Sequence, residues 1–183
     1  EFKKTNSTAL LSLRILSSAI LALCRDAFSL LENDYRIVNG IGRRFGTHLI
    51  GYANEYLAKE GVKDIEKYLI VRPFVGKGEG AITEKRYLRE EVIGKCGSAI
   101  FVFGDRIPNT KSGVMEEFDI ACKQHKAIIP IAYPNMISDD IWNKVNESIT
   151  SYPYLSSTIS SCACPDNRLV PSVVKTIFCS FSL

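Results

Sequence analysis

The sequence has few of the side chains that most often build metal sites. Its 183 residues include only two histidines, His48 and His125, and its six cysteines do not fall at the spacing of zinc ligands. Cys162 and Cys164 form an isolated C-x-C pair, which is weak evidence for a metal or redox role. We therefore expect no metal, and a reducing cytoplasm is the simplest explanation of these cysteines.

The sequence also lacks an uninterrupted apolar run long enough to cross a membrane. Apolar residues gather from Ala9 to Leu23, after Lys3 and Lys4, but Arg14 interrupts them. The run is too short for a bilayer span, and no small-residue cleavage site of a signal peptide follows it. We predict a first strand and a first helix there, and no membrane association.

A strong charge of one sign is missing as well. The sequence contains 23 basic and 20 acidic residues, so the formal net charge is +3. This small excess does not call for a nucleic-acid partner, and it is compatible with a small anionic ligand. A hydrophobic content of 46% and a charged content of 23% are typical of a soluble globular chain.

Short apolar runs alternate with amphipathic ones along the chain. The runs at 100–103 and 128–131 are apolar on both faces, which is typical of central strands in a parallel sheet covered by helices. The alternation predicts βαβ units and a three-layer, doubly wound, Rossmann-like α/β fold with about five parallel strands. The expected strands are 11–16, 35–39, 68–72, 99–103 and 127–132. The expected helices are 19–32, 47–59, 83–96, 114–126, 139–150 and 170–179.

We expect a single domain over residues 1–150. An irregular segment at 151–183 follows, rich in serine, proline and cysteine, with a helix near its end. Pro130 falls inside the last expected strand and has no backbone N–H, so it predicts an edge strand or a bulge.

The most informative stretch runs from Tyr35 to Gly46. An apolar strand signal leads there into a glycine-rich turn, Gly40-x-Gly42, and a helical pattern follows. Such a turn is a ready anion site, because backbone N–H groups and the helix dipole point outward. Arg43 and Arg44 add positive charge, or form a solvated pair. The glycines depart from G-x-G-x-x-G by one residue and could serve only a tight turn.

Ligands of an open parallel sheet bind at the carboxyl ends of its strands. Arg72 ends an expected strand, and a guanidinium at such an edge suits a diphosphate because it donates two parallel hydrogen bonds. Arg89 lies on the next helix with Lys85 and Arg86, where a solvated face with helix ion pairs is the competing interpretation.

Glu116 and Glu117 lie in the first turn of the helix expected at 114–126. Helical periodicity places Glu117 on the flank of the buried stripe and Glu116 closer to water. Both could simply complement the helix dipole. Glu117 would nevertheless reach the carboxyl edge of the sheet, where a carboxylate can accept ribose hydroxyls or attack an anomeric carbon.

Together these segments resemble a SLOG-type Rossmannoid domain of the branch associated with sirtuin-type and TIR effectors, the STALD group. The resemblance runs from about residue 35 to 150. It rests on Tyr35-Arg-Ile-Val-Asn-Gly-Ile-Gly42, Ile70-Val-Arg-Pro-Phe74, Tyr87-Leu-Arg-Glu90, Ala99-Ile-Phe-Val-Phe-Gly104, Glu116-Glu-Phe-Asp-Ile-Ala121 and Ile128-Ile-Pro-Ile131. It implies a pocket for a cyclic ADP-ribose isomer that a partner TIR protein makes from NAD in Thoeris-type antiphage defence. It also implies a homo-oligomer that activates an NAD-cleaving effector.

The resemblance also implies which residues touch the ligand. Phosphate or ribose contacts are expected from Ser17, Ser18, Gly40, Gly42, Arg72, Arg89 and Glu117, and we add Arg43 from the glycine turn. The two serines stand for a serine-containing turn of the family, but they run into a helix sooner than in that family. The tail after Thr150 matches the family poorly.

Two functions remain open at this stage. The leading one is a cytoplasmic sensor domain, not itself an enzyme and with no cofactor, for a cyclic ADP-ribose isomer or ADP-ribose. The alternative is an enzyme of N-glycosidic bonds with Glu117 as nucleophile. Residues 117–121 resemble the E-x-G-x-A helix of nucleoside deoxyribosyltransferases, although Asp119 replaces the glycine. The P-G-G-x-G-T-x-x-E pattern of phosphoribohydrolases is not matched around Gly46.

Overall fold

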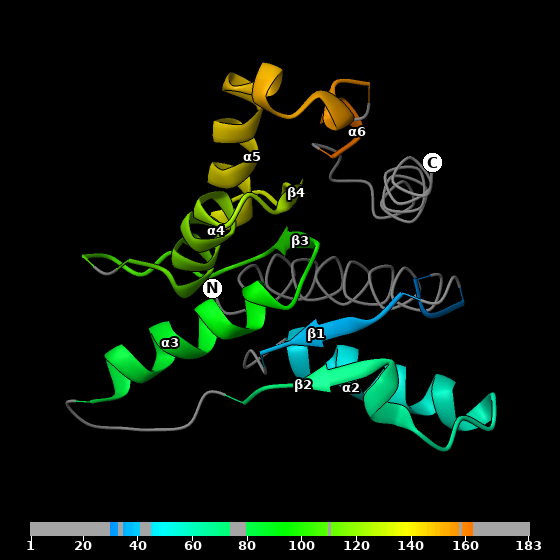
Figure 1. Cartoon of the computed structure of the whole chain (residues 1–183). Helices are drawn as coiled ribbons and strands as arrows, with labels where there is room; N and C mark the ends of the chain where they lie inside the picture. Colours follow the sequence, from blue (N-terminus) through cyan, green and yellow to red (C-terminus); the bar gives the residue numbers. More distant parts are fainter. Residues whose placement is uncertain are drawn as a thin grey trace, which may run out of the picture.

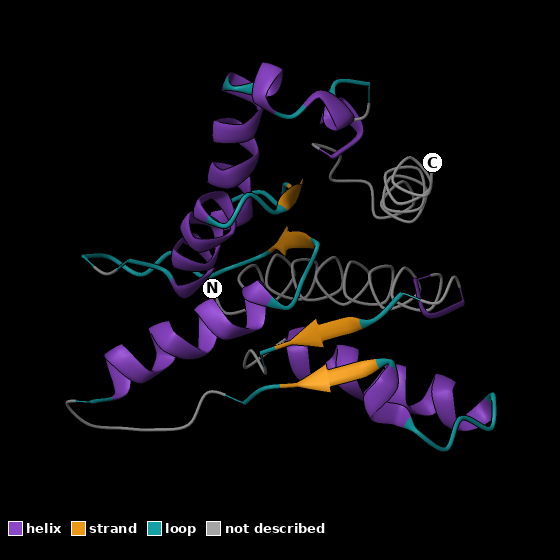
Figure 2. Ribbon diagram, in the orientation of Figure 1, coloured by secondary structure: helices purple, strands orange, loops and turns teal. Residues whose placement is uncertain are grey.

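The computed structural model describes residues 30–32, 35–40, 45–73, 80–109, 111–157 and 159–162. Figures 1 and 2 show that strands and helices alternate along this part of the chain. The strand expected at 11–16 and the helix expected at 170–179 lie outside the described residues.

Four of the expected strands form, as two parallel pairs. Strand β1 (Ile37–Asn39) pairs with β2 (Leu69–Val71), and β3 (Ser98–Val102) pairs with β4 (Ala127–Ile131). The α/β class with parallel strands is thus confirmed, consistent with a Rossmann-like fold. In the described part of the chain, no ladder of hydrogen bonds joins the two pairs.

The helices connect these strands as the alternation predicts. They are α2 (Phe45–Lys59), α3 (Ala81–Gly94), α4 (Gly113–Lys123) and α5 (Ile137–Glu147), with a short 3-10 helix, η1 (Ile65–Lys67), before β2. Figure 1 shows α2 with β1 and β2 in one half of the molecule and α4 and α5 with β3 and β4 in the other. Helix α3 links the halves in sequence.

Two leucines that are adjacent in sequence join the two halves by packing. Leu30 contacts the cluster around Ile131 on β4, whereas Leu31 is buried with Leu57 of α2 and Leu69 of β2. The buried Leu31 contributes roughly 1.5–3 kcal/mol to folding, and the half-buried Leu30 contributes less. This one helical turn therefore holds both strand pairs in one body.

The largest core lies between β3–β4 and the helices α4 and α5. Ile129 on β4 and both Ile141 and Val145 on α5 are 0% exposed. Phe101 of β3 packs edge-on against Phe118 of α4, with ring centroids 5.7 Å apart. Because this core fixes α4 on the sheet, it also fixes the acidic first turn of that helix.

The outer edge of β4 is closed where Pro130 lies. Pro130 keeps a regular register with β3, and among the described strands β4 has only β3 as a neighbour. On that outer edge, Ile128 donates its N–H to the Tyr154 hydroxyl at 2.7 Å, and Ala132 donates to the carbonyl of Cys162 at 3.0 Å. The expectation of an edge strand at Pro130 is met. Pro130 lies between Ile128 and Ala132 on the edge of β4 that faces away from β3, where no N–H is needed to pair with another strand.

The chain after α5 folds back onto this edge. It forms two 3-10 helices, η2 (Ile149–Ser151) and η3 (Pro153–Leu155), and then the short helix α6 (Ile159–Cys162). Leu155 is fully buried, and Trp142 of α5 donates its indole N–H to the Ile159 carbonyl at 2.9 Å. The first part of the segment expected to be irregular is therefore packed on the core, whereas the domain boundary at 150 stays a prediction.

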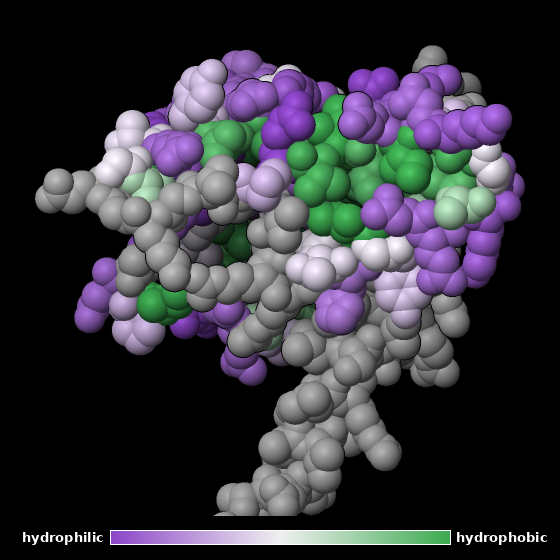
Figure 3. Space-filling view, turned by 90° about the horizontal axis from the view of Figure 1, so that it is seen from below, coloured by the Kyte–Doolittle hydropathy of each residue, from purple (hydrophilic) through white to green (hydrophobic). Residues whose placement is uncertain are grey.

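Apolar side chains also reach the surface on one side. Figure 3, seen from below, shows them gathered over the half of the molecule that carries α2 and β2. Half-buried residues such as Ile50, Val62 and Ile65 pack around the buried core of that half. Within the described residues, no helix is both long and apolar enough to cross a membrane.

Candidate functional site

The loop after β3 brings the beginnings of α4 and α5 together at the carboxyl end of that strand. Gly104 has a φ of +98°, and a β-carbon there would lie 3.0 Å from side-chain atoms of both Val114 on α4 and Ile137 on α5. Glycine is required for both reasons, because other residues are strained at this φ and would collide. The tight turn therefore packs two helix starts against one strand end.

The beginning of α5 is occupied by this same loop. Ile137 donates its N–H to the carbonyl of Gly104, and Ser138 donates to that of Phe103, both at 2.9 Å. Arg106 adds an ion pair to Asp140, with Nη2 and Oδ1 2.6 Å apart. These two N–H groups of α5 are consequently satisfied by the protein and are not free for a ligand.

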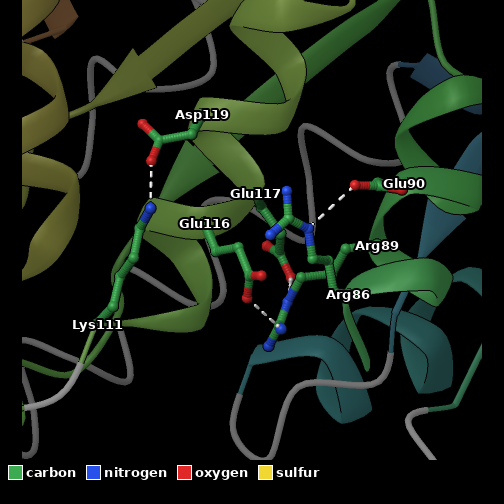
Figure 4. A network of polar contacts seen from close by, with 7 residues as sticks. All are labelled: Arg86, Arg89, Glu90, Lys111, Glu116, Glu117 and Asp119. Carbon is green, nitrogen blue, oxygen red and sulfur yellow. Dashed lines mark hydrogen bonds and ion pairs between the residues drawn. The ribbon is translucent and has the colours of Figure 1, made fainter. Parts of the chain in front are cut away.

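At the beginning of α4, Arg89 of α3 bridges to two carboxylates (Figure 4). Its Nη1 atom lies 2.6 Å from Glu116 Oε2, and its Nε atom lies 3.4 Å from Glu117 Oε1. The Arg89 side chain is only 14% exposed. Arg89 and Glu117, both predicted as site residues, are thus brought together, and Arg89 does not belong to a solvated helix face.

Glu116 differs from its expected position. Periodicity of a single helix placed it closer to water than Glu117, yet its side chain is 26% exposed against 32% for Glu117, and it makes the shorter contact with Arg89. The prediction was wrong because the partner comes from a neighbouring helix, which periodicity within α4 does not reveal.

Gly113, the first residue of α4, was missed by the sequence reasoning. A β-carbon built on it would lie 2.5 Å from Arg89 Nη2 and 3.3 Å from Cζ. The guanidinium therefore packs directly against the backbone at the start of α4. A glycine just before an amphipathic helix is the only sequence signal for this contact.

Burial changes the acidity of Glu117. Loss of solvation raises the pKa of its carboxyl group, the nearby Arg89 guanidinium lowers it, and Glu116 raises it further. The first effect is the largest, so the pKa lies above its usual value. A carboxyl group in this state binds a proton more readily than an exposed glutamate and still accepts hydrogen bonds when ionised.

Arg72 and Gly40 lie at the carboxyl edge of the other strand pair. The register of β1 with β2 places Asn39 opposite Val71, and Arg72 donates its N–H to the Asn39 carbonyl at 2.9 Å. The Arg72 side chain is 44% exposed, and its Nε atom lies 3.8 Å from the Glu91 carboxylate of α3. Two predicted residues are therefore adjacent here, and Arg72 reaches the helix that carries Arg89.

Four predicted site residues, Ser17, Ser18, Gly42 and Arg43, lie outside the described residues, and so does Arg44. Their roles stay predictions. Arg86, a neighbour of Arg89 on α3, forms an exposed pair with Glu90 at 3.2 Å, as expected for a solvated helix face.

A groove of about 370 Å³ lies next to the Arg89 ion pairs. Its walls come from α3, α4 and the residue Lys111 just before α4, which pairs with Asp119 at 2.5 Å (Figure 4). The lining residues are Arg86, Lys111, Glu116, Asp119, Ile120, Cys122 and Lys123. Glu116 thus belongs both to this groove and to the ion pair with Arg89.

The cysteines of the described residues offer little reactivity. Cys96, Cys122 and Cys162 are free thiols, and burial raises the pKa of Cys162 to about 11. Across the described ranges, no group of three His, Cys, Asp or Glu side chains is arranged to hold a metal ion.

Comparison with known proteins identifies the family. The model of the Sir2- and TIR-associating SLOG family, STALD, matches residues 17–169. Relatives described as NAD(+) hydrolase ThsA are 33% identical over 128 residues in Bacillus cereus, 28% over 130 in Enterococcus faecium and 30% over 130 in Cytobacillus dafuensis. These matches cover 67%, 69% and 67% of this chain but only 26%, 27% and 26% of the relatives, so the chain spans about a quarter of their length. The chain belongs to the Sir2- and TIR-associating SLOG family.

Proposed function

We propose that this chain is a sensor domain that binds an NAD-derived nucleotide, a cyclic ADP-ribose isomer or ADP-ribose, and thereby regulates an NAD-hydrolysing effector. Membership of a family associated with Sir2 and TIR proteins supports an NAD-related role in Thoeris-type antiphage defence. The relatives carry the name of an NAD(+) hydrolase, and this chain corresponds to a quarter of their length.

The observation that carries the proposal is the convergence of Arg89 from α3 and Glu117 from α4 at the first turn of α4. An ADP-ribose nucleotide presents a diphosphate and ribose hydroxyls. A guanidinium donates paired hydrogen bonds to phosphate oxygens, and a carboxylate accepts them from ribose hydroxyls. Arg72, at the carboxyl end of β2 and in reach of α3, supplies a second guanidinium for the diphosphate.

The proposal includes partners that the chain alone does not contain. A TIR-type protein makes the nucleotide from NAD, and an NAD-cleaving effector receives the signal. Binding changes the association of several copies of this chain, and the components meet in the cytoplasm. The family assignment supports the NAD-related partners, and the association of copies and the cytoplasmic location are part of the proposal itself.

The alternative, an enzyme of N-glycosidic bonds, receives less support. Its nucleophile would be Glu117, but that carboxylate is already paired with Arg89, with 3.4 Å between Oε1 and Nε. Asp119, which replaces the glycine of the transferase motif, directs its carboxylate to Lys111 at 2.5 Å. Incubation with NAD, nucleosides and nucleotides, followed by chromatography of the released base, tests this alternative directly.

Calorimetric titration tests the sensor. We expect the protein to bind at least one of ADP-ribose, cyclic ADP-ribose isomers and NAD, and each of Arg72→Ala and Arg89→Ala to weaken this binding at least about tenfold, as expected for a lost charge-assisted contact. Arg36→Ala is the matched control, because Arg36 precedes β1 at its opposite, amino end and donates to the Lys67 carbonyl at 2.6 Å. Absence of binding to every one of these nucleotides would overturn the proposal.

A further inference from the structure

We propose that Glu116 is a built-in competitor of the ligand for Arg89. In the free protein its carboxylate occupies the edge of the guanidinium that a phosphate would use, and it moves into the adjacent groove when the nucleotide binds. This inference rests on the proposed function and adds a regulatory residue to the same site.

The first argument is the difference between the two contacts of Arg89. The distance from Nη1 to Glu116 Oε2 is 2.6 Å, whereas that from Nε to Glu117 Oε1 is 3.4 Å. The Glu116 contact has the length of a strong charge-assisted hydrogen bond, and the Glu117 contact is at the long limit. The Glu116 carboxylate therefore stands where a phosphate oxygen would be held most strongly.

The second argument is that Arg89 is fixed more firmly than Glu116. The arginine side chain is 14% exposed and packs against Gly113, so its position depends on the backbone of α4. The Glu116 side chain is 26% exposed and lies on the rim of the groove. When a phosphate arrives, we expect the glutamate to move and the arginine to stay.

The third argument is that the groove can accept the displaced carboxylate. Arg86 and Lys111 line it together with Glu116, and their side chains are 58% and 59% exposed. Their present partners, Glu90 and Asp119, form exposed pairs of small net energy, so an exchange of partners costs little. Glu116 thus keeps a basic environment after it releases Arg89.

This competition lowers the apparent affinity for the nucleotide. A ligand that replaces Glu116 at Arg89 binds only the fraction of molecules in which the Glu116 carboxylate has moved away. Removing the competing charge should increase the affinity, whereas removal of Glu117, a ligand contact in the proposed function, should decrease it. Substitutions of the adjacent Glu116 and Glu117 are therefore expected to have opposite effects on the affinity for the nucleotide.

The test is calorimetric titration of the whole chain with ADP-ribose and, separately, with inorganic diphosphate. We expect Glu116→Gln to bind ADP-ribose about fivefold tighter than wild type or more, by release of the competing carboxylate. Glu116→Asp keeps the charge but is too short for the same contact, and it should also bind more tightly. Glu90→Gln, which removes a charge next to Arg89 in sequence but paired with Arg86, should change the affinity less than twofold.

The outcomes separate this inference from the proposed function. Unchanged or weaker ADP-ribose binding by both Glu116 variants, with melting temperatures like that of wild type, overturns the role of Glu116 and leaves the sensor intact. If neither wild type nor the variants bind any ADP-ribose nucleotide, the sensor fails. Tighter binding of diphosphate by Glu116→Gln would then still support the competition at Arg89, and equal binding of diphosphate would overturn it.

Discussion

The guanidinium of Arg89 lies in space that the missing side chain of Gly113 leaves open. A β-carbon on Gly113 would be 2.5 Å from Arg89 Nη2, closer than real β-carbons approach other atoms. Gly113, the first residue of α4, therefore determines where the Arg89 guanidinium is held, although Gly113 itself carries no charge.

Replacing Gly113 should weaken ligand binding while changing the stability of the fold little. In Gly113→Ala the three atoms nearest to the added methyl group all belong to the guanidinium end of Arg89, so the backbone needs little adjustment. The guanidinium must nevertheless move away from Glu116 and Glu117. We expect ADP-ribose binding, measured by calorimetry, to weaken about fivefold or more, in proportion to the lost charge-assisted contacts, while the melting temperature changes little.

Gly97→Ala is the matched control for this experiment. No atom lies within 4 Å of a β-carbon built on Gly97, which precedes β3 at its amino end. This variant should bind like wild type. Equal binding by Gly113→Ala and wild type would show that Arg89 is not held by this contact.

A second prediction concerns Tyr154 and the closed edge of β4. Its hydroxyl accepts the Ile128 N–H at 2.7 Å and donates to the Ile128 carbonyl at 3.2 Å. Tyr154→Phe leaves both backbone groups without this partner at a strand that is fully buried around Ile128. We expect a loss of about 1–3 kcal/mol in the free energy of unfolding by urea, the cost of unsatisfied buried groups.

The neighbouring tyrosine provides the comparison. The Tyr152 hydroxyl contacts the Cys122 thiol, with 3.9 Å between oxygen and sulfur, and this is a weak hydrogen bond. Tyr152→Phe should therefore cost much less than Tyr154→Phe. Similar losses in the two variants would contradict the importance of the edge contact.

Much of this fold follows from local sequence, because the central strands are apolar on both faces. The strands expected at 99–103 and 127–132 are observed at Ser98–Val102 and Ala127–Ile131. The ends of the helices were less predictable. Helices α3, α4 and α5 each begin one or two residues earlier than expected, and none of them has a side-chain hydrogen bond at its N-cap to announce the start.

The end of α4 shows the same limitation. Its pattern predicted helix to residue 126, but α4 ends at Lys123 because His125 adopts a φ of +52°. Such a turn usually contains glycine, which sequence reasoning would recognise. Periodicity and strand order assigned Glu117 to the site, and the family resemblance assigned Arg89, but the pairing of Arg89 with Glu116 depends on how α3 and α4 pack.

A third prediction uses the opposite pKa shifts of two glutamates. Burial raises the pKa of Glu117 above its usual 4.5, so the folded state binds more protons than the unfolded state in the range just above that value. The contribution of Glu117 to stability should therefore fall as the pH rises from about 4.5. Urea unfolding of wild type and Glu117→Gln across pH 4 to 7 measures this: the variant should gain stability relative to wild type toward higher pH.

Glu91 should show the reverse dependence. A hydrogen bond and charge attraction from Lys95, with a smaller contribution from Arg72, lower the pKa of Glu91 below 4.5. The contribution of the Glu91 carboxylate to the free energy of unfolding is present above pH 4.5, and it is lost as the pH falls through the lowered pKa. Glu91→Gln should thus lose stability relative to wild type toward higher pH. The same slope for both variants would contradict the assigned causes.

The last prediction contrasts two glycines with the same substitution. Gly51 lies within α2, is exposed, and has no atom within 4 Å of a built β-carbon. Gly51→Ala should stabilise the protein by up to about 1 kcal/mol, because alanine is the better helix former. Gly104 has a φ of +98°, and a β-carbon built on it would lie 3.0 Å from side-chain atoms of Val114 and Ile137. Gly104→Ala should therefore destabilise the protein by roughly 1–3 kcal/mol through strain in the turn.

Because this turn positions the start of α4, Gly104→Ala should also weaken ADP-ribose binding, whereas Gly51→Ala should leave it unchanged. Stabilisation by both substitutions in urea unfolding would show that the loop after β3 does not depend on a left-handed glycine.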